Sequence, residues 1–293
     1  MHTSTLDLVA AQPFDFGASL RFLSEFPATA DEQLVTETAL TKAFRVCGRT
    51  VAAELTGAGD GRVRCVLHAE EPIGDEVRSA AADRVGFFLS LDDELEEFYA
   101  VARGDPAFAS VVNSLYGYHQ VKFPSPWENL IWSVLAQRTP MTVATAAKRA
   151  LIEEFGNTIS VAATSFSAFP DPRQLESLSL ERLTELVRNT RKAGLLHRLF
   201  QELPRLDERF LRTAPHDEVR QRLLDLPGIG PWSADFALIR GLGRMNEVPT
   251  EKALLRAAAK VYDQSISESD LCELAAPYGR WRGYWAHYLR LAA

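Results

Sequence analysis

The sequence has 293 residues, 46% of them hydrophobic and 24% charged, which is ordinary for a globular chain of one large or two modest domains. A net charge of −7 excludes affinity for phosphate through bulk charge alone, although a locally basic face or backbone amides would still bind it. Cys47, Cys65 and Cys272 are too few for a disulfide framework. No secretory signal and no apolar run of about 18 residues is visible, so we expect a cytoplasmic protein without a membrane span.

Residues 1–90 favour a mixed α/β region. The segments 44–55 and 62–71 are rich in Val, Cys and Leu with partial alternation, as half-buried strands are. TGAGDG at 56–61 lies between them and predicts a hairpin turn. Apolar residues in 17–26 recur at near-helical spacing. We therefore expect a first domain over residues 1–90.

After about residue 91 the strand signals disappear and helical patterns follow one another at short intervals. These patterns predict helices at 92–103, 126–137, 142–156, 179–189, 192–202, 216–225, 231–242, 251–262 and 268–275. We therefore expect an all-α second domain over residues 91–293, and an α+β fold for the whole chain.

One short segment carries the strongest functional signal. Leu226-Pro227-Gly228-Ile229-Gly230 separates two helical patterns by only a few residues. Two glycines around one apolar residue allow a tight reversal and a close approach of the backbone to another molecule. The amides at the start of the next helix would favour an anion such as a DNA phosphate. An ordinary helix–helix corner would have the same short pattern.

The longer run GIGPWSADFALIRGLGR at 228–244 resembles the helix-hairpin-helix/GPD superfamily, specifically the AlkA-type alkyl-base DNA glycosylases. Segments 125–156, 166–186 and 277–291 resemble further parts of that family in the same order. The resemblance implies an N-terminal TBP-like α/β subdomain followed by an all-α helix-hairpin-helix glycosylase body. It also implies a monomeric, nucleoid-associated repair enzyme that flips a damaged nucleotide out of duplex DNA and cuts its N-glycosidic bond.

The family places a catalytic aspartate after a Val-Pro-like approach, where it stabilises positive charge on the sugar. Here NEVPTEKALLRAA at 246–258 contains no aspartate. Depending on the spacing from Pro249, the equivalent residue is Glu251 or Lys252, and we favour Glu251 because it keeps a carboxylate. Its extra methylene moves that carboxylate, and errors near 1 Å can cost about 100-fold in rate. Lys252 would instead act as an amine nucleophile.

The resemblance also implies a base pocket. Trp232 and Phe236 are four residues apart, so they would share one helix face and could stack on a cationic alkylated purine. Two aromatic residues at this spacing would equally suit a core. Further pocket candidates are Tyr118 and Trp132.

For DNA binding, the resemblance points to the hairpin and to the turn after 126–136, where the family places residues that enter the gap left by the flipped nucleotide. The implied DNA contacts are Pro227, Gly228, Ile229, Gly230, Ser233, Gln137 and Arg138. Candidate phosphate contacts are Arg191, Lys192, Arg240 and Arg244. No cofactor is expected to be required, but the family hairpin often binds Na⁺ or K⁺ through backbone carbonyls, here those of Leu224, Leu226 and Ile229.

Three functions stay open at this point. The first is a monofunctional DNA N-glycosylase acting on alkylated or otherwise damaged bases. The second is a lesion-recognising DNA-binding protein with reduced or lost catalysis, which the missing aspartate and the acidic pI favour. The third is a helical scaffold that uses its hairpin for protein contacts. The sequence does not give the preferred lesion, because that depends on the shape of the pocket.

Overall fold

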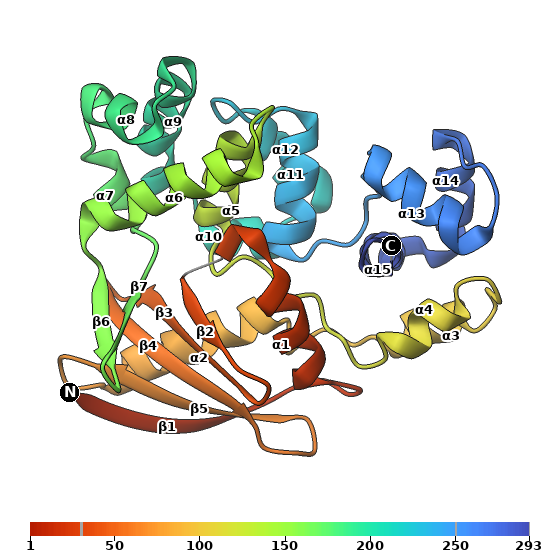
Figure 1. Ribbon diagram of the computed structural model, residues 1–293, viewed down its shortest axis with the longest axis horizontal. Coiled ribbons are helices and arrows are strands. Elements are labelled where there is room, and N and C mark those ends of the chain that lie inside the picture. The colour runs from red at the N-terminus through yellow and green to blue at the C-terminus, as the bar shows by residue number, and fades with distance from the viewer. Residues whose placement is uncertain (30–31, 250, 293) are drawn as a thin grey trace.

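A curved antiparallel sheet forms the N-terminal part of the computed structural model, and a helical body lies along one side of it (Figure 1). The structure describes residues 1–29, 32–249 and 251–292. The sheet has the order β1-β5-β4-β3-β2, with strands β1 (His2–Val9), β2 (Gln33–Val35), β3 (Ala39–Val46), β4 (Arg49–Gly57) and β5 (Arg62–Ala69). Helix α1 (Phe16–Glu25) follows β1, and α2 (Asp75–Leu89) packs on the sheet.

The predicted strand at 44–55 is two strands joined by a tight turn. Cys47 and Gly48 have φ values of 49° and 72°, and Val46 pairs with Arg49. Positive φ at both central residues gives a turn whose twist matches that of the flanking strands. The pattern missed this reversal because Cys47 is apolar and continues the strand composition. The turn predicted at 56–61 is present between β4 and β5.

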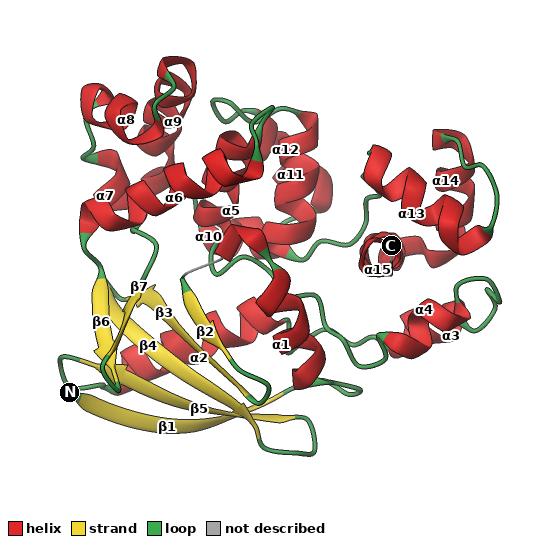
Figure 2. Cartoon of the chain, in the orientation of Figure 1, coloured by secondary structure: helices red, strands yellow, loops and turns green. Residues whose placement is uncertain are grey.

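The rest of the chain is largely helical, as predicted (Figure 2). Its helices are α3 (Glu96–Ala102), α4 (Ala109–Ser114), α5 (Pro126–Ala136), α6 (Met141–Phe155), α7 (Pro172–Glu176), α8 (Leu180–Val187), α9 (Thr190–Glu202), α10 (Glu208–Thr213), α11 (His216–Leu224), α12 (Pro231–Phe236), α13 (Lys252–Tyr262), α14 (Glu268–Ala275) and α15 (Arg282–Leu291). A π-helical turn, Ala237–Gly241, continues α12. Within the described residues, no helix has both the length and the apolar character needed to cross a membrane.

The expectation of an all-α body is wrong at one place. Strands β6 (Thr158–Val161) and β7 (Thr164–Ser167) form a hairpin. The apolar side chains of Ile159 and Phe166 are buried with Ala43 of β3, which has a small side chain. Each strand is only four residues long, too short for an alternating pattern to stand out. The hairpin therefore attaches the helical body to the N-terminal sheet.

The two main hydrophobic cores of the protein are not separated at residue 90. One buried cluster runs from the sheet and α2 through α3 and α4 to α13–α15. A second cluster fills the space among α5–α12. The C-terminal helices thus share a core with the first part of the chain, and the predicted boundary at residue 90 does not mark a boundary between cores.

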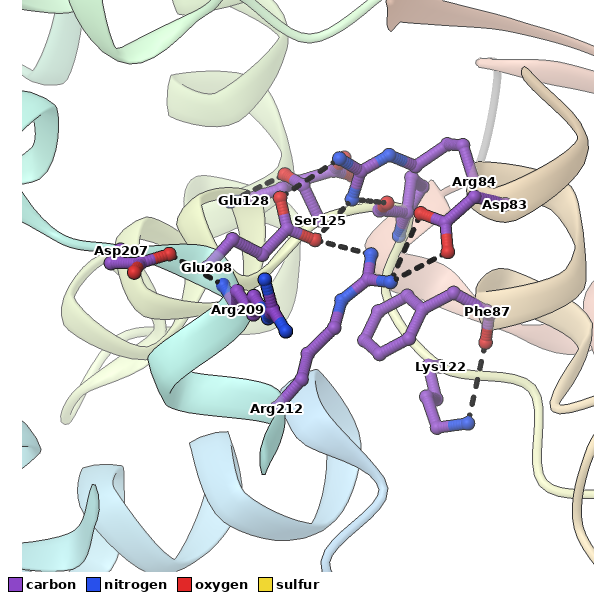
Figure 3. A network of polar contacts seen from close by, with 11 residues as sticks. Asp83, Arg84, Phe87, Lys122, Ser125, Glu128, Asp207, Glu208, Arg209 and Arg212 are labelled. Carbon is purple, nitrogen blue, oxygen red and sulfur yellow. Dashed lines mark hydrogen bonds and ion pairs between the residues drawn. The ribbon is translucent and has the colours of Figure 1, made fainter. Parts of the chain in front are cut away.

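A polar network fixes α2 against α10 (Figure 3). Arg84 donates two hydrogen bonds to the Glu208 carboxylate, at 2.8 and 2.9 Å. Arg212 pairs with Asp83 at 3.0 Å and lies 3.9 Å above the Phe87 ring. Burial alone would raise the pKa of Glu208, but the two arginines outweigh burial and lower it. This charge-assisted contact holds the body in a fixed place relative to the sheet.

Candidate functional site

The predicted hairpin is present between α11 and α12. Gly228 has a φ of +82°, a conformation that side-chain-bearing residues rarely adopt. A Cβ atom there would lie 3.3 Å from Cβ of Leu195, so the turn is also closely packed. Leu226 and Ile229 are buried and anchor the turn, and the Ile229 amide donates to the Leu226 carbonyl at 3.1 Å. The sequence LPGIG therefore folds as a rigid loop rather than a flexible one.

Gln137, expected to contact DNA, lines the groove beside the hairpin and also holds the hairpin in place. Its Nε2 donates to the Gly228 carbonyl at 2.9 Å and to Ser233 Oγ at 3.0 Å. Ser233, another expected DNA contact, is buried by this arrangement. Arg138, the next residue in the chain, is exposed and has a φ of 49°. The turn after α5 is thus locked to the hairpin through Gln137 and presents Arg138 to solvent.

An open groove of about 630 Å³ runs between the turn after α5, the start of α9 and the hairpin. We call it the hairpin groove, and its lining residues include Arg138, Arg191, Lys192, Gly228, Gly230 and Trp232. Burial lowers the pKa of Lys192, whose ammonium group donates to the Leu135 carbonyl and Thr139 Oγ1. Basic side chains therefore gather at the hairpin on a chain that is acidic overall.

A second, much narrower cavity lies beside this groove. It has a volume of about 30 Å³ and is lined by Trp232, Phe236, Ile239, Arg240, Pro249, Glu251, Gly283, Ala286, His287 and Arg290, and we call it the base pocket. The rings of Trp232 and Phe236 stack with centroids 5.3 Å apart and planes at 12°. Trp232 is 44% exposed and lines the hairpin groove as well. The two aromatic residues are thus not simply core residues.

The structure separates the two candidates for the catalytic position. Glu251 stands at the N-cap position of α13, where its side chain makes no capping hydrogen bond. It lines the base pocket and forms an ion pair with Arg290 of α15. Lys252 is exposed and does not line the pocket. Thr250, which precedes them in the quoted stretch, lies outside the described residues. The spacing from Pro249 left both residues open, and the pocket lining favours Glu251.

Arg240, expected to contact phosphate, and His287, which the sequence did not single out, form one wall of the base pocket. Nη1 of Arg240 donates to Nε2 of His287 at 3.4 Å, and the Tyr118 hydroxyl lies 3.2 Å from the same nitrogen. Burial lowers the pKa of Arg240 to about 10, which leaves the guanidinium charged at neutral pH. Burial, and then the charges of Arg240 and Arg290, hold the pKa of His287 well below its usual value. The wall thus combines a charged arginine with a neutral histidine.

Several expected site residues lie elsewhere. Trp132 is buried in the core of the helical body and does not line the base pocket. Tyr118 is buried behind the pocket, beside His287, rather than in its lining. Arg240 is no phosphate contact, because it is only 7% exposed and its guanidinium lies 5.0 Å from the Phe22 ring centroid. Arg244 donates hydrogen bonds to the carbonyls of Leu211 and Ala214, at the C-terminal end of α10.

One sequence signal could have placed Arg240 in the pocket. It follows Phe236 by four residues on one continuous helical segment, and such pairs share a helix face. His287 and Arg290 are three residues apart on α15 and so share one helix face. Nothing in the sequence of α15 indicates which part of the protein packs against that face. The structure holds no group of three His, Cys, Asp or Glu side chains placed to share a metal ion, within its described residues.

Comparisons with known proteins agree with this architecture, although no protein-family model matches the chain. It is 23% identical over 228 residues to the DNA-3-methyladenine glycosylase of Bacillus subtilis, covering 76% of this chain and 75% of that protein. It is 27% identical to the probable bifunctional transcriptional activator/DNA repair enzyme AlkA of Mycobacterium tuberculosis, covering 98% of this chain but 56% of that protein. The 3-methyladenine DNA-glycosylase structure from Archaeoglobus fulgidus superposes with a TM-score of 0.80, at 22% identity and with coverage of 98% and 97%.

The chain thus shares its fold with the DNA-glycosylase structure from Archaeoglobus fulgidus. In sequence it is similar to DNA glycosylases of the AlkA type, as the run at 228–244 implied.

Proposed function

We propose that this chain is a base-excision repair N-glycosylase that flips alkylated or otherwise damaged bases out of duplex DNA and releases them. The observation that carries the proposal is the meeting of an aromatic stack, Trp232 and Phe236, with the carboxylate of Glu251 in one pocket beside the hairpin. An exposed aromatic face binds an unstacked base, and a carboxylate stabilises a sugar cation. Both parts of the proposed chemistry therefore have a candidate side chain in this pocket.

Glu251 has two tasks in this reaction. Its negative charge stabilises the positive charge that develops at C1′ of the sugar as the bond to the base breaks. It then accepts a proton from the water that attacks C1′. Glutamate is longer than the aspartate of the family, and the ion pair with Arg290 restricts where its carboxylate can lie. We propose that this pairing replaces the shorter side chain as the means of holding the carboxylate in position.

The reaction is proposed to be monofunctional hydrolysis rather than a lyase reaction. A lyase reaction needs an amine nucleophile that reaches the sugar. Lys252 is exposed and outside the pocket lining, and Trp232 stands two residues after Gly230, where the resemblance places the lysine of bifunctional glycosylases. Borohydride trapping of the protein on lesion-containing DNA tests this point, and we expect no covalent adduct.

Duplex DNA is the proposed partner, bound along the hairpin groove. Arg138, Arg191 and Lys192 supply local positive charge, and the rigid hairpin presents backbone groups to phosphate. We expect affinity for duplex DNA to fall with salt, with a slope that counts the few phosphates neutralised. Affinity that is independent of salt would favour a protein-binding scaffold instead.

The central experiment measures base release by the full chain from duplexes that each carry one damaged base. Release that depends on Glu251 is expected, and Glu251→Gln should abolish it while leaving DNA binding in place. Tight binding of such duplexes without release from any of them would show that the chain recognises lesions without excising them.

We further propose that the hairpin binds Na⁺ or K⁺ through the carbonyls of Leu224, Leu226 and Ile229. Carbonyl oxygens suit such ions, and these three residues lie at or within the turn. Replacing K⁺ by tetramethylammonium at constant ionic strength should then weaken DNA binding several-fold.

We propose that the protein acts as a monomer in the cytoplasm, bound to nucleoid DNA. Light scattering in solution would measure its oligomeric state.

A further inference from the structure

The start of helix α6 presents large apolar side chains to solvent. Met141 is 49% exposed and Val143 is 52% exposed. Each stands three or four residues before a buried alanine of the same helix, Ala144 or Ala147, so the stripe of α6 that faces the core continues beyond the core. Scattered exposed apolar residues are common on protein surfaces, but these two directly follow a third exposed apolar residue, Pro140. We call Pro140, Met141 and Val143 the apolar tip.

The apolar tip is held at the rim of the hairpin groove. Residues 136–139, which precede it in the chain, line that groove. Gln137 donates to the Gly228 carbonyl at 2.9 Å, and Thr139 Oγ1 donates to the Gln137 carbonyl at 3.0 Å. Lys192 of α9 donates in turn to Thr139 Oγ1. The turn that carries the tip is thus bonded to both the hairpin and α9, which fixes the position of the tip relative to the groove.

The surroundings of the apolar tip suit duplex DNA as its partner. Arg138, Arg191 and Lys192 line the adjoining groove, and the first turn of α6, which is described in full, has no acidic side chain. Positive charge beside an apolar surface fits a ligand that has both phosphates and flat apolar faces. In an intact duplex those faces are covered by stacking. Flipping one nucleotide uncovers the faces of its neighbours and leaves the base on the other strand unpaired.

The apolar tip is separate from the site of the flipped base, because none of its residues lines the base pocket. We propose that the tip packs against the base left unpaired on the other strand and so stabilises the flipped duplex. This inference rests on the proposed glycosylase function and adds a contact to the strand that keeps its base. Apolar side chains that insert among bases stabilise a distorted duplex. They form no strong hydrogen bonds, so the tip does not read which base it contacts.

The test measures binding, so it does not depend on base release. Fluorescence anisotropy compares the affinity of the full chain for a duplex with one tetrahydrofuran abasic site, where the opposite base is already unpaired, and for the same duplex undamaged. Met141→Ala combined with Val143→Ala should lower the preference for the abasic duplex about tenfold and change the affinity for the undamaged duplex less than about twofold. Tenfold corresponds to about 1.4 kcal/mol, which burial of about 60 Å² of apolar surface provides.

Controls separate the apolar tip from general effects on binding. Met141→Leu keeps an apolar side chain and should retain the preference, and Leu180→Ala, which removes an exposed apolar side chain of α8 outside the groove lining, should leave it unchanged. With adenine, cytosine, guanine or thymine opposite the abasic site, wild-type affinities should agree within about threefold. An unchanged preference in the double variant, or a strong dependence on the opposite base, would contradict the inference and leave the glycosylase proposal intact. Failure to bind any of these duplexes would overturn both.

Discussion

The hairpin groove and the base pocket share Trp232, yet they are built in different ways. The groove is open, about 630 Å³, and lined by backbone, glycine and basic side chains. The pocket is about 30 Å³ and lined by aromatic and charged side chains from α12 with its π-helical continuation, from α15 and from the segment before α13. Contacts to phosphate position a protein on DNA, whereas contacts to the base decide what it acts on. An acidic protein can therefore bind DNA locally while its selectivity is set by a few side chains.

The largest expected effect comes from Glu251, where a substitution should remove base release and leave DNA affinity almost unchanged. Glu251→Gln should lower base release by at least about 100-fold, because the charge that stabilises the sugar cation and the proton acceptor are both lost. Affinity for the same duplex should change less than threefold, because Glu251 is not part of the groove. Single-turnover kinetics and fluorescence anisotropy measure the two quantities. Glu268→Gln, an exposed change on α14, is the control and should alter neither.

Trp232 lines both the hairpin groove and the base pocket, so its substitution should lower DNA affinity and base release together. Trp232→Ala removes the stack with Phe236 and a wall of the groove, and stacking of a base on an aromatic ring is worth about 1–3 kcal/mol. We expect base release to fall roughly 10- to 100-fold and affinity for lesion-containing DNA to fall several-fold. Trp232→Phe keeps an aromatic face and should recover most of both. Full activity in the alanine variant would remove Trp232 from the pocket's function.

Gly228→Ala should affect the groove and spare the pocket. The added Cβ meets Leu195 at 3.3 Å and imposes a side chain at a φ of +82°. We expect affinity for undamaged duplex to fall about tenfold and stability to fall by about 1–2 kcal/mol. Release of base from duplex already bound at saturation should stay within about threefold. Gly74→Ala is the matched control, since nothing lies within 4 Å of its Cβ and its φ is −77°.

The smallest expected effect concerns pH and the pocket wall. The pKa of His287 is well below its usual value, so below about pH 6.5 the unfolded chain binds a proton that the native state excludes. This part of the stability is present above pH 6.5 and decreases as the pH falls. In His287→Gln the loss of unfolding free energy between pH 6 and 5 should be smaller by about 1 kcal/mol. Urea titrations measure it, and His2→Gln, exposed on β1, should keep the wild-type slope.

Local patterns predicted the hairpin well, because its cause is local. Two glycines around Ile229 allow the tight turn whatever surrounds it, and Glu251 was favoured over Lys252 because it keeps a carboxylate. The pocket wall could not be predicted in the same way. Arg240 reads as an exposed helical arginine until its helix is known to pack against His287 of α15, 47 residues later. Burial by a distant segment decides its charge environment, and the sequence pattern does not contain that contact.

The same limit explains the missed strands and the core that crosses residue 90. Ile159 and Phe166 become strand residues because β3 and β4 provide a surface of small side chains for them. The boundary at residue 90 reflected a real change in composition, from strands to helices. It did not mark a change of core, because α13–α15 return to the cluster that the first residues begin.

That return has a consequence during synthesis. The hydroxyls of Tyr99 and Tyr288 lie 3.1 Å apart in the folded protein, but 189 residues separate them in the chain. At the usual pace of translation the ribosome needs roughly 10–40 s to cover that distance. Throughout this interval the apolar side chains of α3 and α4 lack α15, the helix that packs on them in the folded protein. Phe98, which contacts Tyr288, is one of these side chains. The core that α3 and α4 begin is therefore incomplete until α15 has been made.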